Sequence, residues 1–133
     1  RLWPKTTFRS VINWTLGTSV DEAAMPLSHI PPTFGVVEVA RKGAMTRLST
    51  SVRYAFAKAA SDFGPGSTDN LQEALPEGSP GWATWNVEGA MQVTDRLEVR
   101  LSGLNLLDLH FRTFGSGISA PGRNVRATLS ARF

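Results

Sequence analysis

The chain has 133 residues, of which 41% are hydrophobic and 19% charged. This length suits one domain, and the low charged fraction argues against disorder driven by charge. The absence of cysteine excludes disulfides, thiolate catalysis and cysteine-ligated zinc, and 2 histidines are too few for a multi-histidine metal site. The net charge is +3, but the basic residues are spread along the whole chain instead of clustering. We therefore expect no nucleic acid among its partners.

Alternation of apolar and polar residues is the main pattern, and it indicates strands with two different faces. The last segment is the clearest, because Asn124 to Phe133 alternate without a break. The second is the weakest, since Val36 and Val37 are adjacent and Glu38 fits only one register. After Leu101 the alternation blurs, and we expect a bulge or a strand end at residues 104–107. The pattern predicts six strands, over residues 7–16, 34–41, 47–56, 85–93, 97–102 and 124–133.

The connections between these strands alternate between short and long. Residues 42–44 and 94–96 read as tight turns, whereas residues 19–32, 61–81 and 109–122 are long loops. In the longest loop, Asp69 and Gln72 resemble a capping box, which predicts a two-turn helix ended by Pro76. Such an order of turns and loops predicts an all-β fold, an antiparallel meander of about six strands.

Alternation alone does not decide what covers the apolar face. In a soluble sandwich or barrel that face surrounds an interior, here one that binds a small apolar ligand, whereas in a transmembrane barrel it meets lipid. Two features favour the membrane. The alternating segments are close in length to the roughly nine to eleven residues of a membrane-spanning strand, and aromatic residues lie near the strand ends. Six strands are too few to close a barrel, so we expect further strands before Arg1. The aromatic residues in question are Trp14, Tyr54, Phe56, Trp85 and Phe133.

Short motifs near the end of the chain carry a family resemblance. They are Gly103-Leu104-Asn105-Leu106-Leu107-Asp108, Phe111-Arg112, Gly115-Ser116-Gly117, Pro121-Gly122-Arg123-Asn124 and the terminal Phe133. This run resembles the closing hairpin of TonB-dependent outer-membrane receptors, and the proline-rich turns at residues 26–32 and 80–82 resemble the preceding hairpins. The resemblance implies that residues 1–133 are the C-terminal portion of such a receptor, the closing segment of a transmembrane β-barrel of about 22 strands. The plug domain and the earlier strands would then lie outside this chain.

The resemblance also implies roles for three groups of residues. The first is similar to the signal read by the outer-membrane assembly machinery, an apolar alternation ending in an aromatic residue: Val125, Ala127, Leu129, Ala131 and Phe133. The second matches the family's closing-loop motif, with Phe111 where a tyrosine is usual: Asn105, Leu106, Asp108, Arg112, Pro121, Gly122 and Arg123. The third comprises basic residues on the polar faces of the strands, which would face the barrel lumen: Arg9, Arg47, Arg53, Arg100, Arg126 and Arg132.

Nothing in the sequence supports an enzyme, a cofactor or a metal site. His29 and His110 stand alone in long loops, and Ser116 lacks the context of a nucleophile elbow and fits turn chemistry instead. We expect the polar-face arginines to pair with acidic plug residues, or to form a solvated face, in preference to touching a ligand.

The family resemblance implies a function, a location and partners. The complete protein would import a scarce ligand across the outer membrane of a Gram-negative bacterium, and a ferric siderophore is the most frequent cargo of the family. The expected partners are the remainder of the barrel and its plug, TonB through the missing N-terminal part, the outer-membrane assembly machinery and the lipid bilayer. The alternatives are the soluble ligand-binding barrel or sandwich and a general-diffusion pore.

Overall fold

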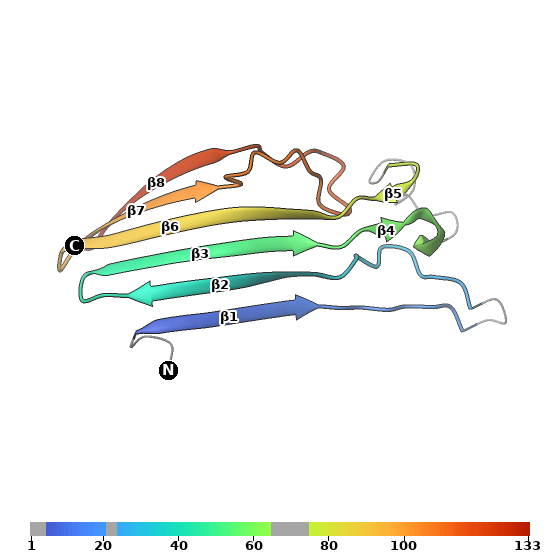
Figure 1. Ribbon diagram of the computed structural model, residues 1–133, viewed down its shortest axis with the longest axis horizontal. Coiled ribbons are helices and arrows are strands. Elements are labelled where there is room, and N and C mark those ends of the chain that lie inside the picture. Colours follow the sequence, from blue (N-terminus) through green and yellow to red (C-terminus); the bar gives the residue numbers. More distant parts are fainter. Residues whose placement is uncertain (1–4, 21–23, 65–74) are drawn as a thin grey trace.

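The protein is built around a single antiparallel sheet of six long strands (Figure 1). The computed structural model describes residues 5–20, 24–64 and 75–133. Each strand of the sheet is hydrogen-bonded to the next in the order β1-β2-β3-β6-β7-β8, so the sheet is an up-and-down meander, as the alternation predicts. The strands are β1 (Thr6–Asn13), β2 (Phe34–Lys42), β3 (Thr46–Ala55), β6 (Trp82–Thr94), β7 (Leu97–Leu104) and β8 (Asn124–Ala131).

The short turns and the long connections lie at opposite ends of this sheet (Figure 1). The β2–β3 turn is closed by a hydrogen bond of 2.7 Å from the Gly43 N–H to the Thr46 carbonyl, and the β6–β7 turn is shorter still. The connections β1–β2, β3–β6 and β7–β8 are long and meet at the other end. We call these the tight-turn end and the long-loop end.

Three small elements lie in the β3–β6 connection and were not predicted. The strand β4 (Lys58–Ala59) pairs with β5 (Gly78–Ser79), and the 3-10 turn η1 (Ala60–Asp62) follows β4. Strands of two residues are too short to show a period, so the sequence pattern misses them. The helix predicted from Asp69 falls on residues outside the described ranges. Within those ranges, no helix is long and apolar enough to cross a membrane.

Several strands end earlier than the alternation predicts, because a strand ends where the neighbouring strand no longer offers residues to pair with. In β8, Ala131 lies opposite Leu97, the first residue of β7, so the paired strand ends there although the alternation continues. In β1, Asn13 lies opposite Phe34, and the chain before Phe34 contains prolines, which have no N–H to donate. The irregularity expected at residues 104–107 is a strand end, and the register shift lies instead between Gln92 and Thr94.

The register divides the strand residues between two faces, since directly paired residues of an antiparallel ladder lie on the same side. One row across the first face shows its polar character: Thr7, Ala40, Ser49, Glu88, Ser102 and Arg126. One row across the opposite face shows its apolar character: Phe8, Val39, Thr50, Val87, Gly103 and Val125. We call these the polar face and the apolar face.

The apolar face is a surface and not a core. Its side chains remain open, with Ile12 63%, Leu48 59% and Leu129 68% exposed. Among the described residues, the buried hydrophobic ones are Ala40, Ala55 and Phe63, too few to form the interior of a domain. The sheet is therefore a single layer, and the described part of the chain forms no second layer over its apolar side.

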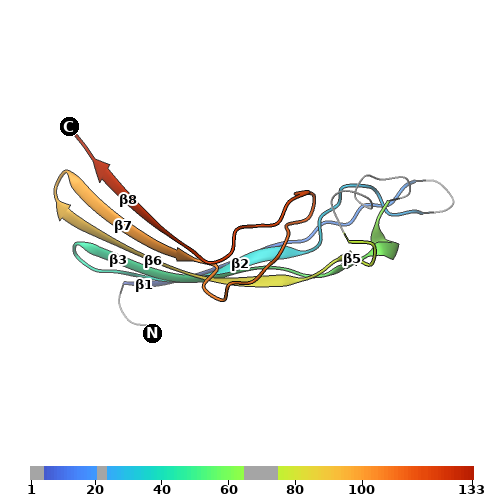
Figure 2. The ribbon, with the colours of Figure 1, turned by 90° about the horizontal axis from the view of Figure 1, so that it is seen from above.

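The sheet is twisted and bent, as right-handed strand twist requires. Figure 2 shows β7 and β8 turned away from the plane of β1, β2 and β3. The β7–β8 connection lies on the side toward which these strands turn (Figure 2). Phe111 in this connection stacks on Trp82, with ring centroids 4.4 Å apart, and the register places Trp82 opposite Ala55 on the polar face. The β7–β8 connection thus folds over the polar face.

Candidate functional site

The polar face collects the arginines that the sequence analysis singled out. The register puts Arg9, Arg47, Arg53, Arg100 and Arg126 on this one side of the sheet. Arg132 follows β8 and lines a hollow together with Glu98 and Arg100 of the same face. Four strands, β1, β3, β7 and β8, therefore contribute guanidinium groups to a common surface.

Glu38 is the acidic centre of one part of this surface. Its Oε2 lies 3.3 Å from Nη2 of Arg9, and its Oε1 lies 3.6 Å from Nη2 of Arg47. The weak alternation of β2 left Glu38 unassigned at the level of sequence, and only its pairing opposite Arg9 and Ser51 places it on the polar face. One carboxylate thus joins three neighbouring strands.

Arg100 forms the mirror arrangement, one cation between two carboxylates. Its Nη2 lies 3.0 Å from Oε1 of Glu98, and its Nη1 lies 3.8 Å from Oε1 of Glu88. The Ser102 hydroxyl, on a residue only 2% exposed, donates a hydrogen bond of 3.1 Å to Oε2 of Glu88. Each of these exposed ion pairs contributes at most about 1 kcal/mol, so their effect is to fix side-chain positions more than to stabilise the sheet.

The polar face keeps a positive excess after these pairings. Within the described part of the chain, Arg53, Arg126 and Arg132 have no carboxylate within ion-pair distance. A surface with unpaired guanidinium groups attracts anions and acidic polypeptide segments.

Three adjoining hollows cross the polar face at the tight-turn end. Their volumes are about 290, 260 and 250 Å³. The first two share Lys42 and Arg47, and the second and third share Glu98 and Arg100, so together they form one groove across the strands. We call this the basic groove; its charged lining residues are Arg9, Glu38, Arg41, Lys42, Arg47, Arg96, Glu98, Arg100 and Arg132.

Asn105 organises the β7–β8 connection at the long-loop end. It is 4% exposed and adopts a positive φ of 49°, a conformation that asparagine tolerates better than most residues. Its side-chain amide donates to the carbonyls of Leu109 (2.8 Å) and Pro121 (3.2 Å), and its Oδ1 accepts from the Leu109 N–H (3.1 Å). Its own N–H donates to Oδ1 of Asn86 in β6 (2.9 Å). One buried side chain therefore ties both ends of the connection to each other.

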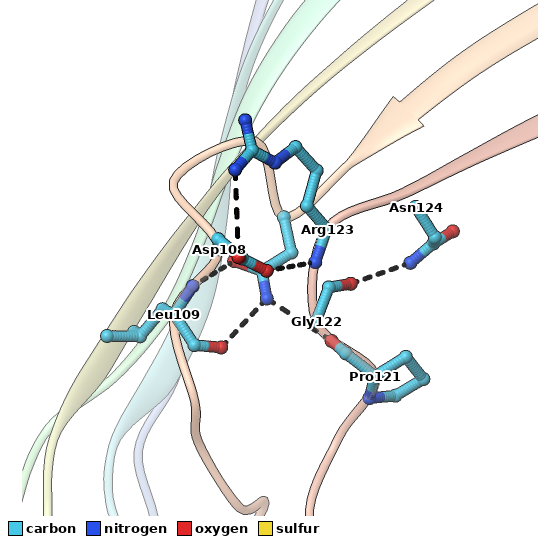
Figure 3. A network of polar contacts seen from close by, with 7 residues as sticks. Asp108, Leu109, Pro121, Gly122, Arg123 and Asn124 are labelled. Carbon is cyan, nitrogen blue, oxygen red and sulfur yellow. Dashed lines mark hydrogen bonds and ion pairs between the residues drawn. The ribbon is translucent and has the colours of Figure 1, made fainter.

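Asp108 makes the second tie between the two ends of this connection (Figure 3). Its Oδ1 accepts a hydrogen bond of 2.7 Å from the Arg123 N–H, and its Oδ2 lies 3.6 Å from the Arg123 guanidinium. The backbone hydrogen bond from Arg123, together with its guanidinium charge, lowers the pKa of Asp108 below its ordinary value. A Cβ on Gly122 would lie 2.8 Å from Oδ1 of Asp108, so glycine leaves room for this contact.

The remaining closing-loop residues take up distinct positions. Leu106 donates its N–H to the Trp85 carbonyl (2.9 Å), which anchors the connection on β6. Arg112 lies beside Phe111 and lines a small hollow with His110 and Ser119. Phe111, at the position where the family resemblance leads us to expect a tyrosine, makes a ring contact with Trp82.

Lys58 joins three long connections and was missed by the sequence analysis. Its Nζ donates to the Ile30 carbonyl (2.5 Å) and lies 5.0 Å from the ring centroid of Phe63 and 4.8 Å from that of Phe114. The residue is only 8% exposed, so these contacts act in a partly dehydrated setting where cation–π attraction is stronger. A lysine on a two-residue strand shows no pattern that could have revealed this role.

The proposed assembly-signal residues lie on β8 and just beyond it. Val125, Ala127, Leu129 and Ala131 pair with residues of the apolar face of β7, and Val125 is 79% exposed. Phe133 follows the strand and is fully exposed. The alternation predicts that Arg126 and Leu129 lie on opposite faces, and the register agrees, with Arg126 opposite Ser102 and Leu129 opposite Val99.

The described residues hold no group of three or more His, Asp or Glu side chains placed to bind a metal ion. His29 and His110 belong to different connections. Ser116 closes a local turn: its N–H donates to the Thr113 carbonyl (3.0 Å) and its hydroxyl to the Ile118 carbonyl (3.0 Å).

Comparisons with known proteins bear on the fold. No protein-family model matches the sequence, and no curated protein sequence matches it. Among solved structures, the copper transporter OprC matches 100% of this chain with a TM-score of 0.83, at 14% sequence identity. The match covers 22% of the OprC chain, so this chain spans about a fifth of that protein's length. OprC is an outer-membrane barrel protein, and the six-stranded sheet has the fold of part of such a barrel.

Proposed function

We propose that this chain forms the closing six strands of an outer-membrane barrel of TonB-dependent type, in a protein that imports a scarce ligand into a Gram-negative bacterium. The observation that carries the proposal is the open apolar face. Many of its large side chains are between 40% exposed, at Val52, and 79% exposed, at Val125, along a continuous single-layer sheet, and the others are half-buried. Lipid is the environment in which such a surface is stable.

The soluble alternative fits this geometry less well. A sandwich or a ligand-holding barrel needs a second layer over the apolar face, and the described residues supply none. Two polar groups on the apolar face are paired as lipid requires: the Trp85 indole N–H donates to the Thr50 hydroxyl (2.7 Å), which donates onward to the Asn86 carbonyl (3.3 Å).

The placement of charge on the two faces supports the same orientation. Within the described strands, Arg41 is the one charged residue that the register assigns to the apolar face, and it lies next to the tight turn, opposite Leu48. An arginine there reaches the membrane interface with its guanidinium while its methylene groups stay in the apolar layer. The other strand charges lie on the polar face, which would line the lumen.

The basic groove suggests what the lumen side contacts. Its excess of arginine is complementary to acidic groups, so we infer that it faces an acidic segment of the plug that the family resemblance implies. TonB and the assembly machinery are the further partners of this proposal.

The structural comparison bears on which ligand the protein imports. The family resemblance makes a ferric siderophore the expected cargo, but the structural neighbour OprC is a copper transporter and lends the siderophore no support. We therefore propose import of a scarce ligand without naming it. A general-diffusion pore is the competing transport function, and a plug domain encoded upstream in the same reading frame would exclude it.

A matched pair of substitutions on β8 tests the orientation. Leu129→Arg puts a charge on the apolar face, whereas Thr128→Arg puts the same charge one residue away on the polar face. An arginine facing lipid at the midplane of a barrel costs about 2 to 4 kcal/mol. In cells producing the protein that carries this chain, we expect Leu129→Arg to reduce the amount in the outer-membrane fraction strongly and Thr128→Arg to leave it near wild type. Equal yields, or a greater loss with Thr128→Arg, would contradict the proposed orientation.

A further inference from the structure

A small hollow at the long-loop end combines an arginine with polar and apolar side chains. Its volume is about 140 Å³, and its polar lining consists of Ser79, His110, Arg112 and Ser119. No acidic residue is among the described residues that line it. We call it the Arg112 hollow.

The folding of the β7–β8 connection explains why these side chains meet. The Ala120 N–H donates to the Phe111 carbonyl (2.8 Å), which pairs the two arms of the connection and sets Ser119 across from His110. His110 Nε2 and Ser119 Oγ share a hydrogen bond of 2.9 Å. Phe111 rests on Trp82, so the flanking Arg112 is held over the polar face by a ring stack at 4.4 Å.

Arg112 itself is the group that needs a partner. It is partly buried, and the described part of the chain offers it no hydrogen bond and no ion pair. By contrast, Arg123 in the same connection is paired with Asp108. The hydrogen bond that His110 and Ser119 share uses one of their donors, so the hollow offers the Arg112 guanidinium, the Ser79 hydroxyl and the remaining donor of that pair. The guanidinium fork matches two oxygens of one acidic group.

We propose that the Arg112 hollow binds an oxyanion group, a carboxylate or phosphate, of a soluble ligand at the long-loop end. The volume admits one such group and not a whole drug-sized molecule, so the rest of the ligand lies outside it. That the group belongs to the imported ligand rests on the function proposed above, whereas the binding itself does not.

Titration calorimetry of the complete protein that carries this chain, in phosphate-free maltoside micelles, tests this site with citrate and inorganic phosphate as probes. We expect at least one of them to bind saturably and Arg112→Gln to weaken that binding about tenfold or more, since it removes a charged bidentate contact. The matched control is Arg53→Gln, which removes a cation from the same face that also lacks an ion-pair partner and does not line the hollow. We expect it to leave binding unchanged.

Two further variants separate binding from folding. Arg112→Lys keeps the positive charge but loses the forked guanidinium group. We therefore expect it to weaken anion binding less than Arg112→Gln does, with an unchanged circular dichroism spectrum. Ser119→Ala removes one donor, and we expect a loss of a few-fold. Absence of saturable binding for both anions, or equal losses with Arg112→Gln and Arg53→Gln, would overturn the site.

A final experiment distinguishes a phosphate group of a soluble ligand from that of a lipid headgroup. The titration is repeated in micelles containing phosphatidylglycerol. Unchanged citrate or phosphate binding supports a soluble ligand, whereas competition by the lipid would assign the hollow to a headgroup and overturn our assignment. Failure of the anion titration leaves the Leu129 and Thr128 comparison unaffected, so the two proposals are tested separately.

Discussion

Asp108 and Arg123, fifteen positions apart in the sequence, are joined by two contacts of different kinds. The carboxylate accepts a hydrogen bond of 2.7 Å from the Arg123 backbone and lies 3.6 Å from its guanidinium. The backbone contact is the shorter, and it is the leading reason for the lowered pKa of Asp108. The pair links the end of β7 to the start of β8 across the whole loop between them.

This pair makes the closing loop sensitive to acid. The pKa of Asp108 is lower in the folded state than in the unfolded state. The stabilisation of the fold by the ionised carboxylate is therefore complete above the ordinary pKa of about 3.9 and is lost as the pH falls through the lowered pKa. We expect Asp108→Asn to reduce the melting temperature of the micelle-bound chain near neutral pH, with the difference from wild type shrinking below about pH 4. A difference that stays constant down to about pH 2 would contradict the assignment.

Asn105 is predicted to contribute more to the closing loop than any neighbouring polar side chain. Asn105→Ala removes three hydrogen bonds and leaves the carbonyls of Leu109 and Pro121 without a partner, so we expect a loss of about 2 to 4 kcal/mol. The control is Asn124→Ala. The side-chain amide of Asn124 donates a single exposed hydrogen bond to the Gly122 carbonyl (3.0 Å), so we expect its removal to lower the free energy of unfolding by about 1 kcal/mol or less. Denaturant unfolding in micelles measures both, and equal losses would refute the role given to Asn105.

Lys58 is predicted to keep three long connections docked on one another. Lys58→Met keeps most of the length of the side chain and removes the hydrogen bond to Ile30 and the attraction to both phenylalanine rings, which together contribute about 1 to 3 kcal/mol. Hydrogen exchange at the Phe63 amide, which donates to the Ala60 carbonyl (3.2 Å), should then become faster. Lys42→Met, at the tight-turn end, should leave that exchange rate unchanged. Unaltered exchange in Lys58→Met would mean that the loops dock without the lysine.

The isolated chain is predicted to need detergent, a partner or the rest of its barrel to remain dispersed. The outer edges of β1 and β8 have no neighbouring strand in the sheet, and they border a wide apolar face. Exposed edges of this kind pair with other chains, and exposed apolar surface associates in water. Light scattering in plain buffer should show association that detergent reverses. A monodisperse monomer with cooperative unfolding would favour the soluble alternative.

The local pattern of the sequence was enough to predict the long strands and the two faces of the last one. Side chains along a strand alternate between its two faces. An unbroken alternation from Asn124 onward therefore places Arg126 and Leu129 on opposite faces. The alternation of tight turns and long loops likewise predicts the meander, because successive connections in an antiparallel sheet must change ends.

Only the tertiary structure decided the positions that depend on contacts between distant segments. Glu38 sits in a strand whose own pattern is ambiguous, and its face follows from pairing with Arg9 and Ser51 on neighbouring strands. Lys58 and Arg112 lie where no period operates, so their surroundings depend on how the loops fold over the sheet. Periodicity is a property of consecutive residues, whereas charge pairing and hollows arise from residues that the fold brings together.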